Sequence, residues 1–155
     1  TAIGERLAGA AAASPMRMAR TERADGVLII DDTYNANPES VAAALRAAVA
    51  LRTGERRVAA VLGEMLELGA ESAERHHEIG GLAAELGVDL VVAVGEAAWP
   101  IADGAADAGA MEVMRVEDTE VAGQTMSAWL RPGDIVLVKA SRGARLERVT
   151  AVLGA

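Results

Sequence analysis

Residues 27–38 read VLIIDDTYNANP, and this stretch decides the fold. Its first four residues are apolar and typical of a buried strand, which runs into Asp31 and Asp32. A polar loop follows, in which Asn37 has the residue type that caps helices and Pro38 suits the first helical position. A buried strand joined to a helix by a short loop is the first half of a βαβ unit, from which parallel sheets are built.

The same alternation of apolar strands and amphipathic helices continues along the chain. It predicts a mostly parallel sheet with helices on both faces. Residues 16–22 are expected to form an antiparallel strand at one edge, because only a short turn at 24–26 separates them from the next strand. The sequence therefore predicts a Rossmann-like, doubly wound α/β domain of three layers. Further strands are expected at 58–62, 90–94, 111–116 and 135–138, and helices from 38 onward and at 71–86, 97–108, 119–130 and 142–153.

The composition is that of a single globular domain. The chain has 155 residues, of which 52% are hydrophobic. A net charge of −8 argues against non-specific binding to nucleic acids or anionic membranes, which requires a basic surface. The absence of cysteine excludes disulfides, thiolate metal sites and a cysteine nucleophile. No apolar stretch reaches the length of a membrane span and no charged leader opens the chain, so we expect a cytoplasmic protein.

The first 13 residues are rich in alanine and are expected to form a short helix. It should end at Ser14-Pro15, because proline disfavours helix in the residue before it. This segment looks like the tail of a preceding domain, so the domain itself is expected at 14–155.

Three strand ends are unusually polar or rich in glycine, at residues 31–38, 63–69 and 139–143. Ligands of open α/β sheets bind beyond the carboxyl ends of the strands, and the helix N-termini there favour anions. The sequence contains no GxGxxG after the first strand, no GxxxxGK[ST] and no HExxH. We therefore expect neither a dinucleotide site nor a phosphate cradle nor a metal site within this chain.

Three motifs resemble, in order and spacing, those of the C-terminal domain of the Mur ligases, the ATP-dependent ligases of peptidoglycan synthesis. They are DDTYNANPES at 31–40, LGEMLELGAES at 62–72 followed by His76 and Gly80, and RPGDIVLVKASRG at 131–143. Residues 14–18, SPMRM, resemble the hinge that arrives from the central domain. The resemblance covers about residues 14–153, and the tyrosine–asparagine form of the first motif points to the members that use D-alanyl-D-alanine.

The resemblance implies an enzyme of three domains, in which the first holds a UDP-sugar, the second carries the phosphate-binding loop and the third closes over both. This chain would be the third domain, with residues 1–13 as the end of the second, no catalytic residue of its own and no activity alone. ATP would phosphorylate the carboxylate of UDP-N-acetylmuramoyl-tripeptide, and the amine of D-alanyl-D-alanine would attack the acyl phosphate. Mg²⁺, bound mainly by the central domain, would neutralise the phosphates.

The resemblance also places ATP against the hinge and the first loop. Asp32 would accept hydrogen bonds from the ribose hydroxyls with Arg17 beside it; alternatively, the two aspartates only end the strand and Arg17 pairs with one of them. Tyr34 is the only tyrosine of a chain without phenylalanine, and a lone aromatic in a polar loop favours a contact with a ligand or another domain. The residues expected to bind ATP are Arg17, Asp32, Tyr34, Asn35 and Asn37, although Asn37 would cap its helix in any case.

The loop after the last strand would face the incoming amino acid. There the ammonium of Lys139, the only lysine, and the hydroxyl of Ser141 would hold the carboxylate of D-alanyl-D-alanine. Otherwise Ser141 is a plain helix cap and Lys139 a surface charge. His76 either contacts substrate or is a partly buried histidine satisfied by its neighbours, and Glu64 either contacts substrate or binds backbone N–H groups. The residues expected to bind substrate are Lys139, Ser141, Arg142, Glu64 and His76.

Two departures and two alternatives accompany the resemblance. Many family members have glycine where this chain has Ala140, and His77 looks like a variable neighbour of the family's histidine. Another Mur ligase or a folylpolyglutamate synthase is disfavoured, because the asparagine-rich loop lacks their histidine. A stand-alone binding or signalling module, such as a receiver domain, is disfavoured because both aspartates precede one loop and no third aspartate ends the next strand.

Overall fold

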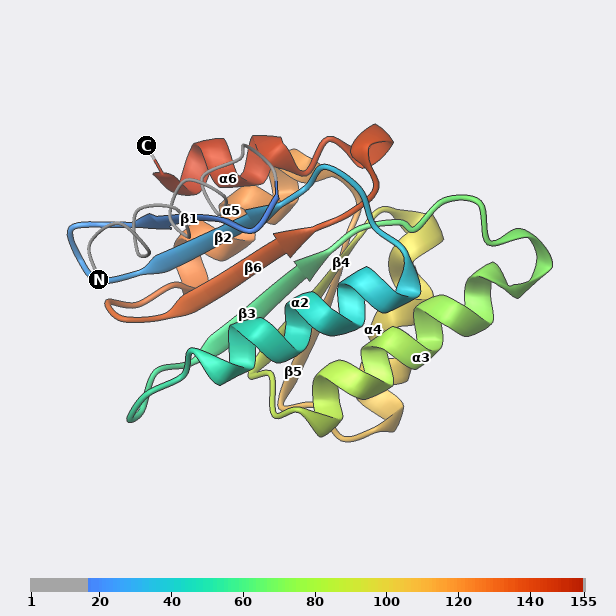
Figure 1. Cartoon of the computed structure of the whole chain (residues 1–155), viewed down its shortest axis with the longest axis horizontal. Helices are drawn as coiled ribbons and strands as arrows, with labels where there is room; N and C mark the ends of the chain where they lie inside the picture. Colours follow the sequence, from blue (N-terminus) through green and yellow to red (C-terminus); the bar gives the residue numbers. More distant parts are fainter. Residues whose placement is uncertain (1–16, 155) are drawn as a thin grey trace, which may run out of the picture.

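The computed structural model describes residues 17–154, which form a six-stranded sheet between two layers of helices (Figure 1). The strands follow the order β1-β2-β6-β3-β4-β5, and every neighbouring pair is parallel except β1 with β2. This confirms the predicted mostly parallel α/β fold with one antiparallel edge strand. The helix expected over residues 1–13 lies outside the described residues, as do residues 14–16 of the hinge expected at 14–18. The strands are β1 (Ala19–Glu22), β2 (Leu28–Asp32), β3 (Val58–Leu62), β4 (Leu90–Val94), β5 (Glu112–Val116) and β6 (Ile135–Lys139).

Among residues 17–154, three helices cover one face of the sheet and two cover the other (Figure 1). The first group is α2 (Pro38–Ala50), α3 (Ser72–Glu85) and α4 (Trp99–Asp107); the second is α5 (Thr119–Trp129) and α6 (Glu147–Gly154). Short 3₁₀ turns lie at η1 (Gly69–Glu71), η2 (Glu96–Ala98) and η3 (Arg142–Ala144). The start of α2 is as predicted: the Asn37 side chain accepts from the Ser40 N–H at 2.8 Å, and the Ser40 hydroxyl accepts from the Asn37 N–H at 3.0 Å.

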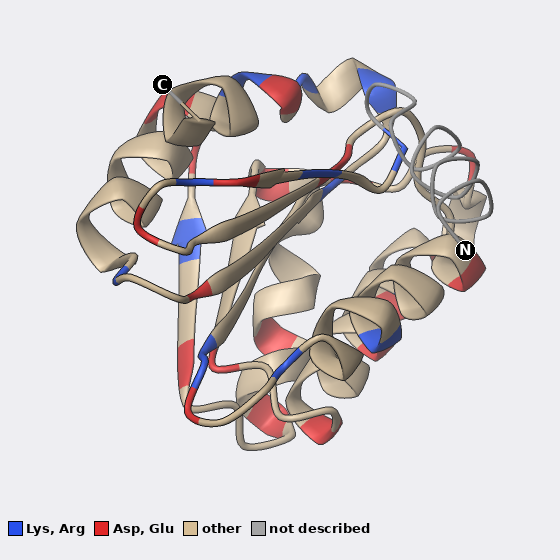
Figure 2. Cartoon of the chain, turned by 60° about the vertical axis from the view of Figure 1, so that its left-hand side comes forward, with Lys and Arg blue, Asp and Glu red and all other residues tan. Residues whose placement is uncertain are grey.

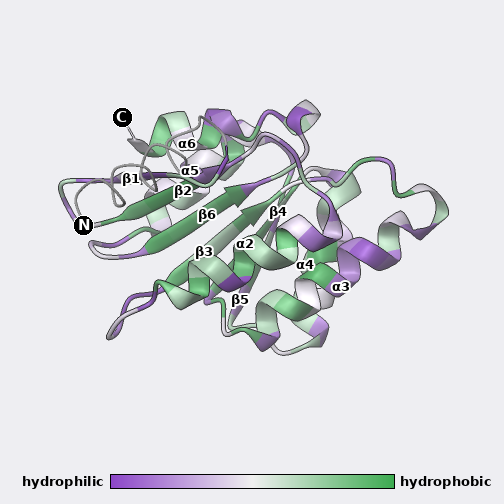
Figure 3. Ribbon diagram, viewed as in Figure 1, coloured by the Kyte–Doolittle hydropathy of each residue, from purple (hydrophilic) through white to green (hydrophobic). Residues whose placement is uncertain are grey.

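The core lies on both faces of the central strands. All residues of β3, β4 and β6 are buried, which explains why these strands read as unbroken apolar runs. Hydrophobic residues follow the strands in Figure 3, and charged residues lie mainly on helices and loops in Figure 2. Among residues 17–154, no helix combines the length and the apolar character needed to span a membrane.

Helices α3 and α4 pack backbone against backbone. A Cβ atom on Gly80 would overlap the carbonyl oxygen of Ile101, and one on Gly104 would overlap the carbonyl oxygen of His77. Glycine is therefore required at both positions by the close approach of the two helices.

The last helix is shorter than predicted. Residues 142–153 were expected to form one helix, but η3 ends at Ala144. The next residue, Arg145, has a left-handed backbone with φ 55°, and α6 begins only at Glu147. A left-handed residue cannot continue a right-handed helix, so the chain turns here before α6 starts. Leu146, Val149 and Leu153 are buried, as predicted.

Candidate functional site

The carboxyl ends of three neighbouring strands bring three loops together. In the sheet, Asp32 at the end of β2 is paired with Lys139 at the end of β6, and Lys139 is paired with Leu62 at the end of β3. The loops that follow these strands are residues 33–37, 140–146 and 63–68. These loops are the three polar strand ends that the sequence analysis identified. They lie together at the carboxyl ends of the strands, where ligands of such folds bind.

Lys139 links the first two loops from inside the protein. Its Nζ donates to Asp32 Oδ2 at 2.7 Å and to the carbonyl oxygen of Asn35 at 2.9 Å, and the residue is 3% exposed. A buried ammonium is tolerated only when it is paired and hydrogen-bonded. Lys139 is therefore not a surface charge; it holds the β2–α2 loop against β6.

The two neighbouring aspartates serve opposite faces of the sheet, because side chains alternate along a strand. Asp31 accepts hydrogen bonds from the N–H and hydroxyl of Thr33, at 3.2 and 2.6 Å, and from the hydroxyl of Thr150 in α6 at 3.1 Å. Asp32 accepts from Lys139 on the other face and from the N–H of Met18 at 3.2 Å. Asp31 thus fastens α6, whereas Asp32 belongs to the loop cluster.

Ser141 links the third loop to the other two. Its Oγ accepts from the N–H of Leu66 at 3.0 Å and donates to the carbonyl oxygen of Ala36 at 3.4 Å, and the residue is 2% exposed. Its side chain makes no helix-cap hydrogen bond, so the expectation of a plain cap is wrong.

His76 holds the 63–68 loop in place through hydrogen bonds inside the protein. Its Nε2 accepts from the N–H of Met65 at 2.9 Å, and its Nδ1 donates to the carbonyl oxygen of Ser72 at 2.6 Å, a tautomer assigned from these two partners. The residue is completely buried and both ring nitrogens are occupied. Of the two alternatives for His76, these contacts agree with a buried histidine that is satisfied by its neighbours, and they let His76 shape the 63–68 loop.

Tyr34 lies at the rim of the site, close to two guanidinium groups. The Arg17 guanidinium carbon is 3.9 Å from the centre of the ring, and that of Arg142 is 5.3 Å from it, both within cation–π range. Tyr34 is 38% exposed. Arg17 therefore lies on Tyr34, and among the residues that the structure describes it forms no ion pair with Asp31 or Asp32.

The two asparagines of the first loop have different surroundings. Asn37 caps α2 with its side-chain oxygen. Asn35 is exposed, and its backbone carbonyl, not its side chain, receives Lys139. The side chain of Asn35 therefore remains available at the site, next to Tyr34.

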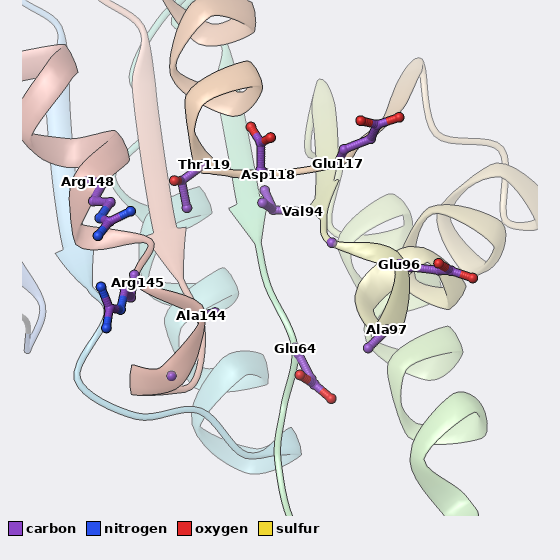
Figure 4. Close-up of a pocket in the computed structure, with 12 residues that line it drawn as sticks. Glu64, Val94, Glu96, Ala97, Glu117, Asp118, Thr119, Ala144, Arg145 and Arg148 are labelled. Carbon is purple, nitrogen blue, oxygen red and sulfur yellow. The ribbon is translucent and has the colours of Figure 1, made fainter.

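A cleft of about 360 Å³ opens beside the loop cluster (Figure 4). Of the residues that the sequence marks as substrate-binding, only Glu64 lines it. Sequence reasoning missed Arg145 and Arg148, because both read as surface positions of a helix; the left-handed turn at Arg145 brings that stretch to the rim of the cleft. The other lining residues are Val94, Gly95, Glu96, Ala97, Glu117, Asp118, Thr119, Gly143 and Ala144.

The arrangement is suited to binding and orienting polar ligands. It offers exposed guanidinium groups, an aromatic ring, an amide and carboxylates at one edge of a rigid sheet. Within residues 17–154, no three acidic or histidine side chains gather closely enough to hold a metal ion.

Comparison with known proteins gives consistent matches along the chain. Residues 16–142 match the family model described as Mur ligase, glutamate ligase domain. The UDP-N-acetylmuramoyl-tripeptide–D-alanyl-D-alanine ligase of Mycobacterium tuberculosis is 42% identical over 96% of this chain, which corresponds to 34% of that relative. The chain therefore spans about a third of the length of the curated relatives it matches.

Solved structures of similar proteins share the fold. The crystal structure of MurF ligase from Thermotoga maritima in complex with ADP matches 90% of this chain and 30% of its own, with a TM-score of 0.75 and 34% identity. A crystal structure of MurF from Acinetobacter baumannii matches the same shares with a TM-score of 0.77 and 30% identity.

Proposed function

The chain belongs to the Mur ligase family, as its glutamate ligase domain, and from this we propose that it is the C-terminal domain of an enzyme that joins D-alanyl-D-alanine to UDP-N-acetylmuramoyl-tripeptide. The observation that carries the proposal is the 42% identity, over 96% of the chain, with a ligase named for that reaction. On this proposal residues 1–13 end the preceding ATP-binding domain, and residues 14–155 form the closing domain. Because the enzyme would use ATP and a UDP-linked substrate, we place it in the cytoplasm.

The proposed reaction activates a carboxylate and then forms an amide. The γ-phosphoryl group of ATP passes to the terminal carboxylate of the tripeptide, which gives an acyl phosphate and ADP. The amine nitrogen of D-alanyl-D-alanine then attacks the carbonyl carbon, and inorganic phosphate leaves as the nitrogen loses a proton. The contribution of this domain would be to bind and orient the reactants.

On the ATP side we assign the rim formed by Arg17, Tyr34, Asn35, Asn37 and Asp32. A carboxylate offers about four acceptor positions, and Asp32 uses two of them for Lys139 and Met18. It can still accept from a ribose hydroxyl. The exposed stack of Arg17 on Tyr34 supplies a cation and an aromatic face for the nucleotide.

On the substrate side we assign Glu64 and Arg142 to contacts with ligand, and Lys139, Ser141 and His76 to the positioning of the loops. The last three side chains are at most 3% exposed and are hydrogen-bonded within the protein. Each of them joins segments that are far apart in the sequence, so the loops keep one common geometry. Mg²⁺ would neutralise the phosphates of ATP and, on this proposal, is bound by the other domains of the enzyme.

The proposal is tested by assaying the complete enzyme with ATP, UDP-N-acetylmuramoyl-tripeptide and D-alanyl-D-alanine. We expect ADP release that depends on both the tripeptide and the dipeptide. Single amino acids used by sister ligases, such as D-glutamate, should not replace the dipeptide. ADP release with a single amino acid in place of the dipeptide would assign the chain to another ligase of the family.

The assignment of Asp32 has its own test in the same enzyme. Asp32→Asn should raise the KM for ATP and leave the KM for the dipeptide nearly unchanged, because one oxygen no longer accepts the ribose hydroxyl. Asp31→Asn is the matched control, since Asp31 bonds Thr33 and Thr150 on the opposite face. A change in the dipeptide KM alone would reassign the first loop to the amino-acid substrate.

A further inference from the structure

A groove lies beside the edge of the sheet, where α6 packs against β2. It has a volume of about 320 Å³ and runs between α6 and the strands β1 and β2 (Figure 1). None of its lining residues belongs to the cleft at the carboxyl ends of the strands. Apart from one isoleucine and two carboxylates, the lining side chains are no larger than threonine, which leaves room for a long side chain from elsewhere to enter. The lining residues are Ala19, Thr21, Ile29, Asp31, Glu147, Thr150, Ala151 and Gly154.

Glu147 carries a buried carboxylate oxygen without a partner. Its Oε2 is enclosed by protein, and among residues 17–154 no group donates a hydrogen bond to it. The only other such side-chain atom in this part of the chain is Arg52 Nε, whose guanidinium group is anchored through Nη2 to Gly87 and Asp89. Taking a carboxylate oxygen out of water without a partner is costly, so the arrangement points to a cation that comes from outside these residues.

The neighbours of Glu147 in the groove do not supply that cation. Asp31 is itself negative, and its carboxylate already accepts hydrogen bonds from Thr33 and Thr150. The Thr150 hydroxyl has a single proton, and its two acceptors are Asp31 and the backbone carbonyl of Glu147. No lysine or arginine of residues 17–154 lines the groove. The groove therefore combines two carboxylates with no positive charge of its own.

We propose that this groove is a docking surface for the preceding domain, from which it receives a lysine or arginine side chain with Glu147 Oε2 as the acceptor. The inference rests on the proposed function in one respect, that the chain is the closing domain of a longer enzyme. The chain corresponds to 34% of its Mycobacterium tuberculosis relative, so most of such an enzyme lies outside it. Ala19 of the lining is two residues from Arg17, where the chain arrives from the proposed hinge, so the preceding polypeptide approaches next to the groove.

The test compares the same two substitutions in the complete enzyme and in this 155-residue chain alone. Glu147→Gln removes the charge and keeps the size of the side chain. Glu120→Gln is the matched control, because Glu120 is exposed and lies in the first turn of α5 as Glu147 lies in the first turn of α6. Both variants lose the same favourable interaction with a helix N-terminus. The measurement is the rate of backbone hydrogen exchange in β1 and α6, followed by mass spectrometry.

In the complete enzyme, Glu147→Gln should raise the exchange rates of β1 and α6 about tenfold over the control, as expected for the loss of one charge-assisted hydrogen bond. In the chain alone the two variants should exchange within about twofold of each other, because there the Glu147 carboxylate has no partner to lose.

An equal effect of Glu147→Gln in both proteins would show a role within this domain and overturn the inference. Protection that disappears when the complete enzyme is diluted would assign the groove to a second copy and would overturn it as well. Ligation of the dipeptide by the wild-type enzyme is assayed separately. Its absence would overturn the proposed function, whereas the difference between the complete enzyme and the chain alone would still decide the docking surface.

Discussion

His76 and His77 are neighbours in the sequence with opposite surroundings. His76 is completely buried between Met65 and Ser72, whereas the side chain of His77 is 48% exposed and pairs with Asp107 at the surface. His76→Ala should lower the free energy of unfolding by about 3 kcal/mol, because it leaves a cavity and an unsatisfied N–H on Met65. His77→Ala is the matched control and should cost less than about 1 kcal/mol. Urea unfolding of the two variants measures this difference, and equal losses would contradict the buried role.

The Lys139–Asp32 pair makes a second prediction at the scale of single residues. Lys139→Met should destabilise the chain by about 3 kcal/mol, because the Asp32 carboxylate, 13% exposed, loses its partner. The double variant with Asp32→Asn should recover part of that loss, since no charge is then stranded. Unfolding curves of the wild type, the two single variants and the double variant give the coupling directly. Additive losses would show that the two side chains act independently.

Local roles could be predicted from sequence at this scale, and long-range partners could not. Asn37 is a helix cap because of residues within three positions of it, so the sequence contained the whole signal. Lys139 and Asp32 are 107 positions apart, and they meet only because β6 inserts next to β2 in the sheet. Nothing near either residue shows that the only lysine is buried.

At the scale of elements, the contact between α3 and α4 gives a test with an internal control. Gly80→Ala should lower the free energy of unfolding by about 3 kcal/mol, because the new methyl group would overlap the backbone of Ile101. Gly81→Ala should instead raise it by about 0.5–1 kcal/mol, because its Cβ would lie 3.9 Å from the nearest atom and alanine favours helix. Thermal melts of both variants measure these opposite changes in stability. A loss at both positions would mean that glycine is needed for another reason.

Elements were easier to predict from the sequence than their order. The strand at 58–62 is a buried apolar run between Arg57 and Gly63, and its predicted limits match β3 (Val58–Leu62). The helix predicted over 142–153 is interrupted by the left-handed backbone of Arg145. The sequence did not predict this interruption, because arginine is not a residue type typical of left-handed backbone. The cleft was not predicted for the same reason, since Arg145 and Arg148 have the pattern of ordinary helix-surface residues.

For the whole molecule, we expect the chain to fold alone and to lack ATP turnover. Residues 17–154 close two hydrophobic cores around one sheet, which favours a single cooperative unfolding transition. The sequence has no GxxxxGK[ST] loop to hold the phosphates of ATP. Calorimetry should show one transition, and a coupled assay with ATP should show no ADP above background. ADP release by this chain would contradict its assignment as a closing domain.

The hydrogen bonds that Lys139 and Ser141 make to other loops have a consequence for how the sequence of such a domain can evolve. Lys139 donates to the side chain of Asp32, so a replacement at either of these two positions is harmful until the other changes as well. The partners of Ser141 are backbone groups of Leu66 and Ala36, which other residues at those positions would also supply. Residues 32 and 139 should therefore be inherited as a pair, kept together or exchanged together.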